Sequence, residues 1–286
     1  MKVPFIAERT SHRLLQKICP VRRPDTHKGD YGRILLLCGA EGYTGAPALA
    51  ANAALRAGAG LIFVGVPRCV YPIVASKLTA PMVFPLPDAE GKLSVDALPE
   101  ILHRLSGMDA CLVGPGLGMS SQTEALVTET VRHAVCPLVL DADGINCIAG
   151  HIDVLREAAC PVVFTPHEGE FRRLTQEPES DRLSGAVRLA KQTGAVILRK
   201  GHTTLITDGK KSYVNRTGNP GMAAGGSGDV LAGIITAFLR QGAPPLEAAA
   251  AGAWLSGTAG DLAAAKYGQY AMTPEDLIGQ LSRQLP

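Results

Sequence analysis

Short apolar runs, most of them rich in β-branched residues, recur along the chain with helix-like stretches between them. The runs are continuous rather than alternating in polarity, which is typical of strands that helices cover on both faces. Seven strands are predicted, at residues 33–38, 61–66, 82–86, 110–114, 137–140, 161–165 and 195–199. This succession favours one α/β domain built on a doubly wound, mainly parallel sheet.

Residues 203–214 show a different pattern, with two short β-forming runs on either side of Asp208-Gly209. This arrangement predicts a small antiparallel hairpin. Helices are predicted at residues 45–57, 230–240 and 245–265, and residues 1–27 are expected to form an N-terminal helix and linker. The alanine-rich helix at 245–265 has small residues suited to tight packing, which favours a homo-oligomer. The absence of a linker or repeat within the chain leads us to expect a single domain over residues 1–286.

The composition is that of a globular protein, with 46% hydrophobic and 19% charged residues and a net charge of +2. The basic residues are scattered, which argues against a nucleic-acid partner. Their densest stretch, residues 13–33, is interpreted as a solvated helix and linker, with contact to an anionic ligand as the alternative.

The seven cysteines form no C-x-x-C pair, which indicates a reducing compartment. Neither a signal peptide nor a membrane partner is expected, because the N-terminal apolar run is short and no uncharged run reaches the roughly 18 residues of a membrane span. The expected location is the cytoplasm.

The strongest chemical motif is the glycine-rich run at residues 219–233, which leads into the helix predicted near Val230. Backbone N–H groups at such a turn, together with the helix dipole, form an anion site. Its loop consists of Gly225, Gly226, Ser227 and Gly228, and an acidic residue, Asp229, follows directly. We expect the N–H groups to hold a transferring phosphate while Asp229, kept ionised by the dipole, orients and deprotonates an attacking hydroxyl. The alternative role for Asp229 is a simple helix N-cap.

Other polar and glycine-rich segments follow predicted strands, and therefore lie on the rim where open α/β sheets bind ligands. They are residues 42–46 (GYTGA), 114–118 (GPGLG), 141–146 (DADGIN), 165–170 (TPHEGE) and 200–204 (KGHTT). Gly116 and Gly118 are candidates for close backbone contact with a ligand. For Asp141, Asp143 and Asn146, turn and capping roles stay open beside a functional one. Plain turns likewise remain the alternative for residues 42–46 and 200–204.

These motifs, in this order, together with residues 28–32 (KGDYG) and 56–60 (RAGAG), resemble those of the NAD(P)H-hydrate dehydratases of the ribokinase-like superfamily. The resemblance implies that Ala46, His167 and Asp229 contact the hydrated cofactor. It further implies that Gly228 and the segment Lys200, Gly201, His202, Thr203 and Thr204 bind the AMP part of a nucleotide. Glu170 would support Mg²⁺ through water rather than as a direct ligand. The related sugar kinases carry Asn where this chain has His167.

The activity that the resemblance implies is dehydration of the (6S) hydrate of NADH or NADPH, coupled to cleavage of ADP, or ATP, to release phosphate. The enzyme would then be a hydro-lyase, forming a tetramer and working with a separate epimerase for the hydrate. One alternative is a kinase of thiamine precursors, such as a hydroxyethylthiazole or hydroxymethylpyrimidine kinase, and another is a nucleotide-sensing module without catalysis. His167 argues against the first alternative, and Asp229 argues against the second.

Overall fold

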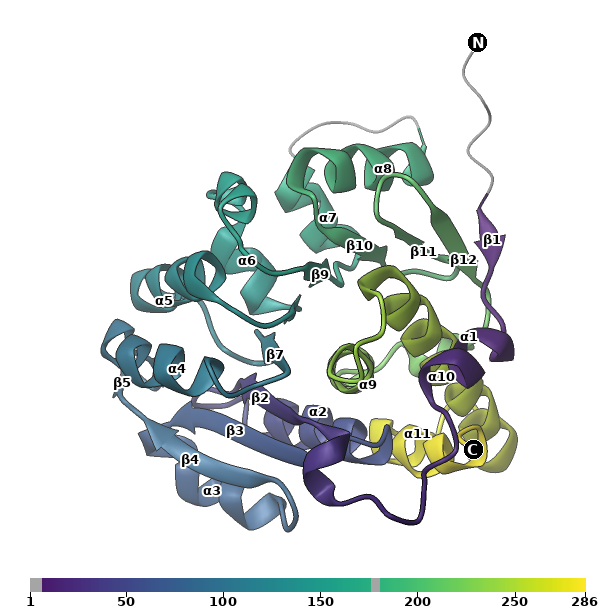
Figure 1. Cartoon of the computed structure of the whole chain (residues 1–286), viewed down its shortest axis with the longest axis horizontal. Helices are drawn as coiled ribbons and strands as arrows, with labels where there is room; N and C mark the ends of the chain where they lie inside the picture. Colours follow the sequence, from purple (N-terminus) through teal and green to yellow (C-terminus); the bar gives the residue numbers. More distant parts are fainter. Residues whose placement is uncertain (1–6, 176–180) are drawn as a thin grey trace.

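The structure, a computed structural model, describes residues 7–175 and 181–286, and its centre is a mainly parallel sheet (Figure 1). Ten strands pair in the order β1-β12-β11-β10-β9-β8-β7-β2-β3-β4. Their bounds are β1 Glu8–Arg9, β2 Arg33–Leu37, β3 Leu61–Pro67, β4 Met82–Leu86, β7 Ala110–Val113, β8 Leu138–Leu140, β9 Val162–Phe164, β10 Val196–Arg199, β11 Thr204–Thr207 and β12 Ser212–Asn215. The seven strands predicted from continuous apolar runs are all present, each end within one residue of its predicted position.

The predicted antiparallel hairpin is confirmed, since β11 pairs with β12 in antiparallel register. It joins the sheet through β10, which is also antiparallel to β11, whereas β4, β3, β2, β7, β8, β9 and β10 are parallel to one another. Three further strands were not predicted: β1 at the sheet edge, and the pair β5 (Asp88–Ala89) and β6 (Lys92–Leu93). Each is two residues long, which is too short to show a periodic pattern.

Alternate residues of the central strands enter two separate cores, one on each face of the sheet. In β2, Ile34 and Leu36 face one core, whereas Leu35 and Leu37 face the other. The first core is covered by α1 (His12–Ile18), α2 (Gly45–Arg56), α3 (Tyr71–Lys77), α9 (Ser227–Leu239), α10 (Pro245–Tyr267) and α11 (Pro274–Gln280). The second is covered by α4 (Leu98–Leu105), α5 (Ser121–His133), α6 (Asp143–Ile148), α7 (Glu168–Thr175) and α8 (Arg182–Thr193). The sheet is therefore doubly wound, as predicted (Figure 1).

The small residues of α10 are used inside the subunit. Gly252 packs so closely on α9 that a Cβ there would lie 2.7 Å from Ile235 Cγ1, and one at Gly257 would lie 2.1 Å from Thr217 Oγ1. Most of the alanines of this helix are buried as well. The tight packing predicted for this segment is confirmed, and it is packing within the subunit.

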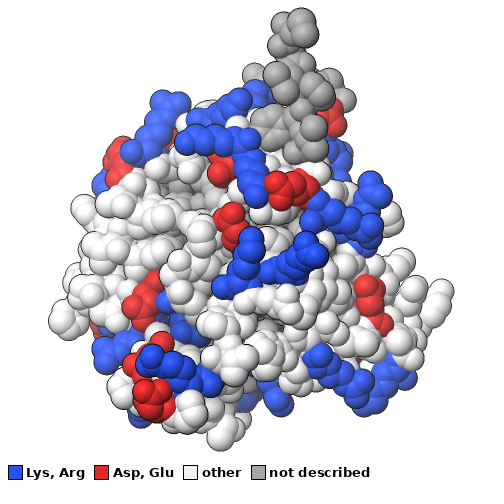
Figure 2. Space-filling model, turned by 45° about the vertical axis from the view of Figure 1, so that its right-hand side comes forward, with Lys and Arg blue, Asp and Glu red and all other residues white. Residues whose placement is uncertain are grey.

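Charged side chains on the face drawn in Figure 2 lie in several separate groups, with acidic residues between basic ones. The N-terminal helix predicted within residues 1–27 is present as α1, which buries Leu14, Leu15 and Ile18 in the core it shares with α10. Within the described part of the chain, no helix has both the length and the apolar character needed to cross a bilayer.

Helices α2 and α9 approach closely because Gly233 has no side chain: a Cβ there would lie 2.2 Å from the carbonyl oxygen of Ala50. We expect Gly233→Ala to lower the free energy of unfolding by about 1–3 kcal/mol, the range typical of an overpacked core. Gly279 in α11 is a matched control, because a Cβ there meets nothing within 4 Å. Gly279→Ala should stabilise by about 0.5–1 kcal/mol, since alanine is the better helix former. Urea unfolding of both variants measures the difference, and equal effects would contradict this account of the contact.

Candidate active site

The carboxyl ends of the central parallel strands bring the predicted motifs together at one edge of the sheet. The loop after β2 contacts the loop after β7, with Gly39 N donating to Pro115 O at 2.9 Å. Gly114 lies so close to the loop after β8 that a Cβ there would be 1.8 Å from Asp141 O. The loop after β10 joins the one after β9 through Lys200 N and Pro166 O at 2.8 Å. The loops predicted to share a rim are thus neighbours in space.

Asp229 lies in the first turn of α9, three residues after the N-cap. The N-cap is Gly226, whose φ of 103° is left-handed, and no side chain caps this helix. The N-cap alternative for Asp229 is therefore wrong. The glycine turn leaves the first N–H groups of α9 without helical partners, which is the arrangement required of an anion site.

Burial, together with the charge of Asp141, raises the pKa of Asp229 to about 7, although the charge of Lys200 acts in the opposite direction. The expectation that the helix dipole keeps Asp229 ionised is therefore wrong. Desolvation and a like charge outweigh the dipole, which is worth at most about 2 kcal/mol even in a favourable geometry. With a pKa close to neutral, this carboxylate is a stronger base than an ordinary aspartate.

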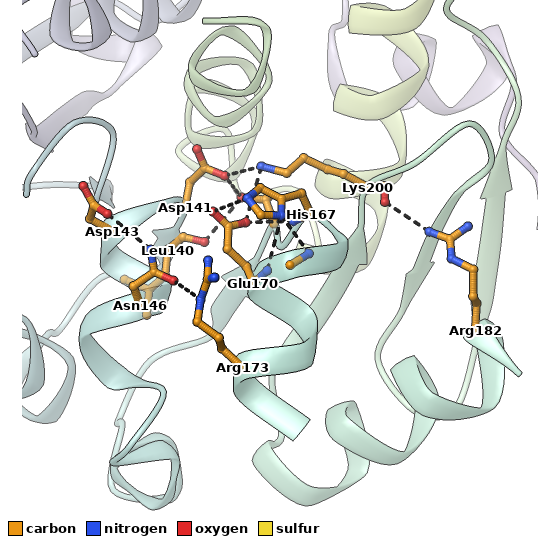
Figure 3. A network of polar contacts seen from close by, with 11 residues as sticks. Leu140, Asp141, Asp143, Asn146, His167, Glu170, Arg173, Arg182 and Lys200 are labelled. Carbon is orange, nitrogen blue, oxygen red and sulfur yellow. Dashed lines mark hydrogen bonds and ion pairs between the residues drawn. The ribbon is translucent and has the colours of Figure 1, made fainter. Parts of the chain in front are cut away.

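Asp141 joins three strand ends and is almost completely buried (Figure 3). Its Oδ1 accepts a hydrogen bond of 2.6 Å from Thr165 Oγ1 and one of 2.8 Å from Lys200 Nζ. Lys200 Nζ also lies 4.0 Å from Glu170 Oε2. Although burial by itself would lower the pKa of Lys200, the charges of Asp141 and Glu170 raise it above its ordinary value. The sequence did not predict the ion pair of Asp141 with Lys200, because nothing in the local sequence distinguishes Asp141 from Asp143.

His167 and Glu170 cap the start of α7 reciprocally. His167 Nδ1 accepts hydrogen bonds from the backbone N–H groups of Gly169 (2.9 Å) and Glu170 (3.2 Å), and Glu170 Oε2 accepts one from His167 N (2.8 Å). Because Nδ1 accepts, the neutral ring carries its hydrogen on Nε2, which lies 3.3 Å from Glu170 Oε1. The His167 side chain remains 55% exposed, whereas that of Glu170 is only 5% exposed. The ring is thus fixed in position with one side open to a ligand.

Ala46 and Gly116, both predicted to contact substrate, are neighbours. A Cβ on Gly116 would lie 3.1 Å from Ala46 Cβ, and the φ of this glycine is +62°. Gly118 N donates to Asp143 Oδ2 at 2.9 Å, so Asp143 holds this loop in place. Asn146 in turn binds Asp143 and Arg173. Asp143 and Asn146 thus have structural contacts that link α6 to the loop of Gly118 and to Arg173, and neither caps α6, whose N-cap is Ala142.

The segment from Lys200 to Thr204 connects β10 to β11, as predicted. Arg182, the first residue of α8, supports it by donating to Thr203 O at 2.9 Å and to Lys200 O at 3.1 Å. Gly201 is needed there, because a Cβ would lie 2.7 Å from Arg182 Nη2. No sequence signal marked Arg182, since it lies 18 residues before the segment and in another element.

No cluster of three or more His, Cys, Asp or Glu side chains positioned to hold a metal ion occurs in residues 7–175 and 181–286. A magnesium ion bound to a nucleotide needs no such cluster, because phosphates and waters supply most of its ligands and one or two carboxylates complete the site. The carboxylate of Glu170, which lies 4.0 Å from Lys200 Nζ, fits that requirement.

Comparison with known proteins matches residues 34–283 to the family model described as NAD(P)H-hydrate dehydratase. The chain is 47% identical over 266 residues to a bifunctional NAD(P)H-hydrate repair enzyme of Moorella thermoacetica, covering 91% of this chain and 50% of that one. It thus spans about half the length of such bifunctional relatives. It is also 35% identical to an ADP-dependent (S)-NAD(P)H-hydrate dehydratase of Cenarchaeum symbiosum, covering 92% of this chain and 91% of that one.

Among solved structures, an ADP/ATP-dependent NAD(P)H-hydrate dehydratase of Bacillus subtilis, co-crystallised with ATP and Mg²⁺, superimposes with a TM-score of 0.80. It is 28% identical to this chain, and the match covers 99% of this chain and 98% of that one. This neighbour, together with the strand order, identifies the fold as ribokinase-like.

The raised pKa of Asp229 has a consequence for stability. The native state holds this proton more tightly than the unfolded chain does, so stability falls as the pH rises from about 4 to about 7. Asp229→Asn removes that penalty, and we expect it to gain about 4 kcal/mol over the parent at pH 8 but little at pH 4. Thermal unfolding of both proteins across this range tests the expectation. Asp153→Asn is the control, because the Asp153 side chain is 80% exposed and should show no such gain. A gain independent of pH would contradict the assignment.

Proposed function

Because the chain belongs to the NAD(P)H-hydrate dehydratase family, we propose that it dehydrates the (6S) hydrates of NADH and NADPH with ADP as the phosphate donor. This makes it a hydro-lyase coupled to conversion of ADP to AMP and phosphate. The observation that carries the proposal is the placement of Asp229 in the first turn of α9, behind an uncapped glycine turn and beside Lys200.

The chemistry starts from a poor leaving group. Hydroxide leaves the nicotinamide ring slowly, so the ring hydroxyl is first phosphorylated. Asp229 orients that hydroxyl and accepts its proton as the oxygen attacks the terminal phosphorus of ADP, and AMP leaves. The lone pair of the ring nitrogen then expels phosphate by breaking the C–O bond, and loss of a proton from the adjacent ring carbon restores the double bond.

The N–H groups of the first turn of α9 face the charge that develops on the transferred phosphoryl group. Gly225, Gly226, Ser227 and Gly228 supply these donors in our proposal, and the bare turn at Gly226 supports it. The backbone of Lys200, Gly201, His202, Thr203 and Thr204 binds the rest of the nucleotide. The fixed geometry that Arg182 gives this segment supports that role.

The hydrated ring is bound at another part of the same rim, by Ala46, Gly116, Gly118 and His167. The close contact of Ala46 with Gly116 and the exposed ring of His167 support this assignment. Magnesium bound with the nucleotide supplies charge neutralisation for the phosphates, and Glu170 holds its water shell.

We extend the proposal to the domain organisation, oligomeric state and location of the enzyme. Residues 1–286 act as one dehydratase domain, and an epimerase activity supplies the (6S) form. The protein works as a homotetramer in the cytoplasm. The seven free cysteines support a reducing location.

A single assay tests the proposed activity. The protein is mixed with hydrated NADH, Mg²⁺ and either ADP or ATP, and recovery of reduced-nicotinamide absorbance is followed. We expect recovery with ADP, AMP in equal amount, and no use of the (6R) epimer. Absence of recovery with both donors, combined with phosphorylation of hydroxyethylthiazole or hydroxymethylpyrimidine, would establish the kinase alternative.

The role of Asp229 is tested by Asp229→Asn, which preserves size and removes the charge. Turnover should fall by roughly 10² to 10⁴, the range for loss of a positioned general base, while ADP still raises the melting temperature. In the parent, kcat/KM should decline as the pH falls below about 7, because the reaction needs the ionised form. A folded Asn variant with near-normal turnover would rule out this mechanism.

His167 combines a capping role with a proposed substrate contact, and two substitutions separate the two. His167→Ala loses both, so it should lower stability by about 1 kcal/mol and weaken use of the hydrate more than use of ADP. His167→Asn retains a capping oxygen, so it should keep near-parental stability but show the same defect toward the hydrate. Measurement of KM for both substrates, and of the melting temperature, separates the capping role of His167 from its contact with the hydrate. A KM increase for ADP alone would place His167 on the nucleotide side instead.

A further inference from the structure

The side chain of Lys200 is directed away from the segment whose backbone we assign to the nucleotide. Its Nζ lies 2.8 Å from Asp141 Oδ1 and 4.0 Å from Glu170 Oε2, in the interior of the site (Figure 3). Only 20% of this side chain is exposed, and only 2% of that of Asp141. Contact with AMP accounts for the backbone of residues 200–204, but it leaves this buried ion pair unexplained.

The pair lies against the first turn of α9, at the residue directly before Asp229. A Cβ built on Gly228 would be 3.4 Å from Lys200 Nζ and 3.9 Å from Asp141 Oδ2. Asp141 thus uses Oδ1 for Thr165 and Lys200, whereas Oδ2 faces the helix that carries Asp229. A positive and a negative group are therefore both held next to the proposed base.

We propose that Asp141 and Lys200 are positioning residues that together set the charge of Asp229, with Asp141 favouring its neutral form and Lys200 its ionised form. The inference rests on the proposed function, in which Asp229 accepts the proton of the substrate hydroxyl. The two residues act through Asp229 and leave the proton transfer itself to it.

The groups facing Asp229 come from several elements. Asp141 follows β8, Lys200 follows β10, and Glu170 of α7 lies behind Lys200. Cys38, directly after β2, is another titratable group near Asp229. Burial raises the pKa of the Cys38 thiol well above its ordinary value, and Asp229 and Asp141 add to the effect, so Cys38 stays uncharged. Burial raises the pKa of Asp229, and two opposing charges then adjust it: the carboxylate of Asp141 raises it and the ammonium of Lys200 lowers it.

This balance suits the proposed reaction. A base with a pKa near the working pH is ionised in a large share of molecules and still accepts a proton readily. Without Asp141, the charge of Lys200 would lower the pKa of Asp229 and make it a weaker base. Without Lys200, burial and Asp141 would raise the pKa, so that more molecules would hold the proton and could not accept another.

The test is a direct titration of Asp229 in the free protein by NMR of ¹³C-labelled aspartate carboxyl groups. The resonance that disappears in Asp229→Asn identifies the group. Lys200→Met should raise its midpoint by about one pH unit and Asp141→Asn should lower it by about as much, the lower end of the range for a charge within contact distance. The double variant should titrate between the two. Lys210→Met is the matched control, because Lys210 is exposed in the turn after β11, at the end of that strand away from the site.

Opposite shifts would support the proposal, whereas shifts in the same direction, or none, would overturn it. Lys200→Met leaves Asp141 buried without its partner, so a poorly folded protein is a foreseeable result. Asp141→Asn leaves the Lys200 ammonium with the Glu170 carboxylate 4.0 Å away, and the double variant removes both charges, so the comparison of these two variants suffices. A purely structural role for the pair would lower activity in every variant without moving the titration in opposite directions.

The same variants distinguish this inference from the proposed function. The acidic limb of kcat/KM should follow the titration of Asp229 in each variant. A protein that fails to dehydrate the hydrate but shows opposite shifts would disprove the function and retain the inference. Normal dehydration without any shift in the titration of Asp229 would support the function and disprove the inference.

Discussion

The site depends on one buried carboxylate, Asp141, which joins the ends of three adjacent strands. It follows β8, accepts a hydrogen bond from Thr165 after β9, and pairs with Lys200 after β10. Removing one partner of such a buried pair typically costs about 3–5 kcal/mol, because the remaining charge is left without compensation. The requirement to satisfy this carboxylate therefore fixes three loops relative to one another, and α9 presents its first turn to that rigid group.

The backbone at Ala142 directs the two neighbouring carboxylates to different tasks. Its φ of 49° is unusual for a residue with a side chain, and such a conformation costs on the order of 1–3 kcal/mol. Asp141 points into the interior, whereas Asp143 points to the loop of Gly118 and holds its N–H. A single strained residue thus couples the loop proposed for the hydrated ring to the group that faces Asp229.

Features carried by local patterns were predictable, and features made by tertiary contact were not. Continuous apolar runs located seven strands to within a residue, because burial on both faces imposes that pattern along the chain. The prediction that the glycine-rich segments after strands share one rim was also correct, because parallel strands bring their carboxyl ends to the same edge of the sheet. The different roles of Asp141 and Asp143 could not be predicted, since they depend on the backbone at Ala142.

The pKa of Asp229 was misjudged because the sequence shows its helix but neither its burial nor its neighbour Asp141. Arg182 was missed because its role arises only from the folding of α8 against the next hairpin.

The balance of charge at the site is consistent with the Mg²⁺ that we propose to arrive with the nucleotide. Among the described residues, the centre gathers three carboxylates, of Asp141, Glu170 and Asp229, around one ammonium, that of Lys200. A nucleoside diphosphate adds further negative charge. The N–H groups of α9 offset only part of this charge, since a helix terminus amounts to roughly half an elementary charge. A nucleotide that arrives with Mg²⁺ brings its own compensation and needs only a carboxylate to hold the ion's waters. The negative charge of Asp141 also helps to keep the pKa of Asp229 high before the phosphate binds. The charge that disfavours an anion in the empty site therefore also makes Asp229 a more effective base.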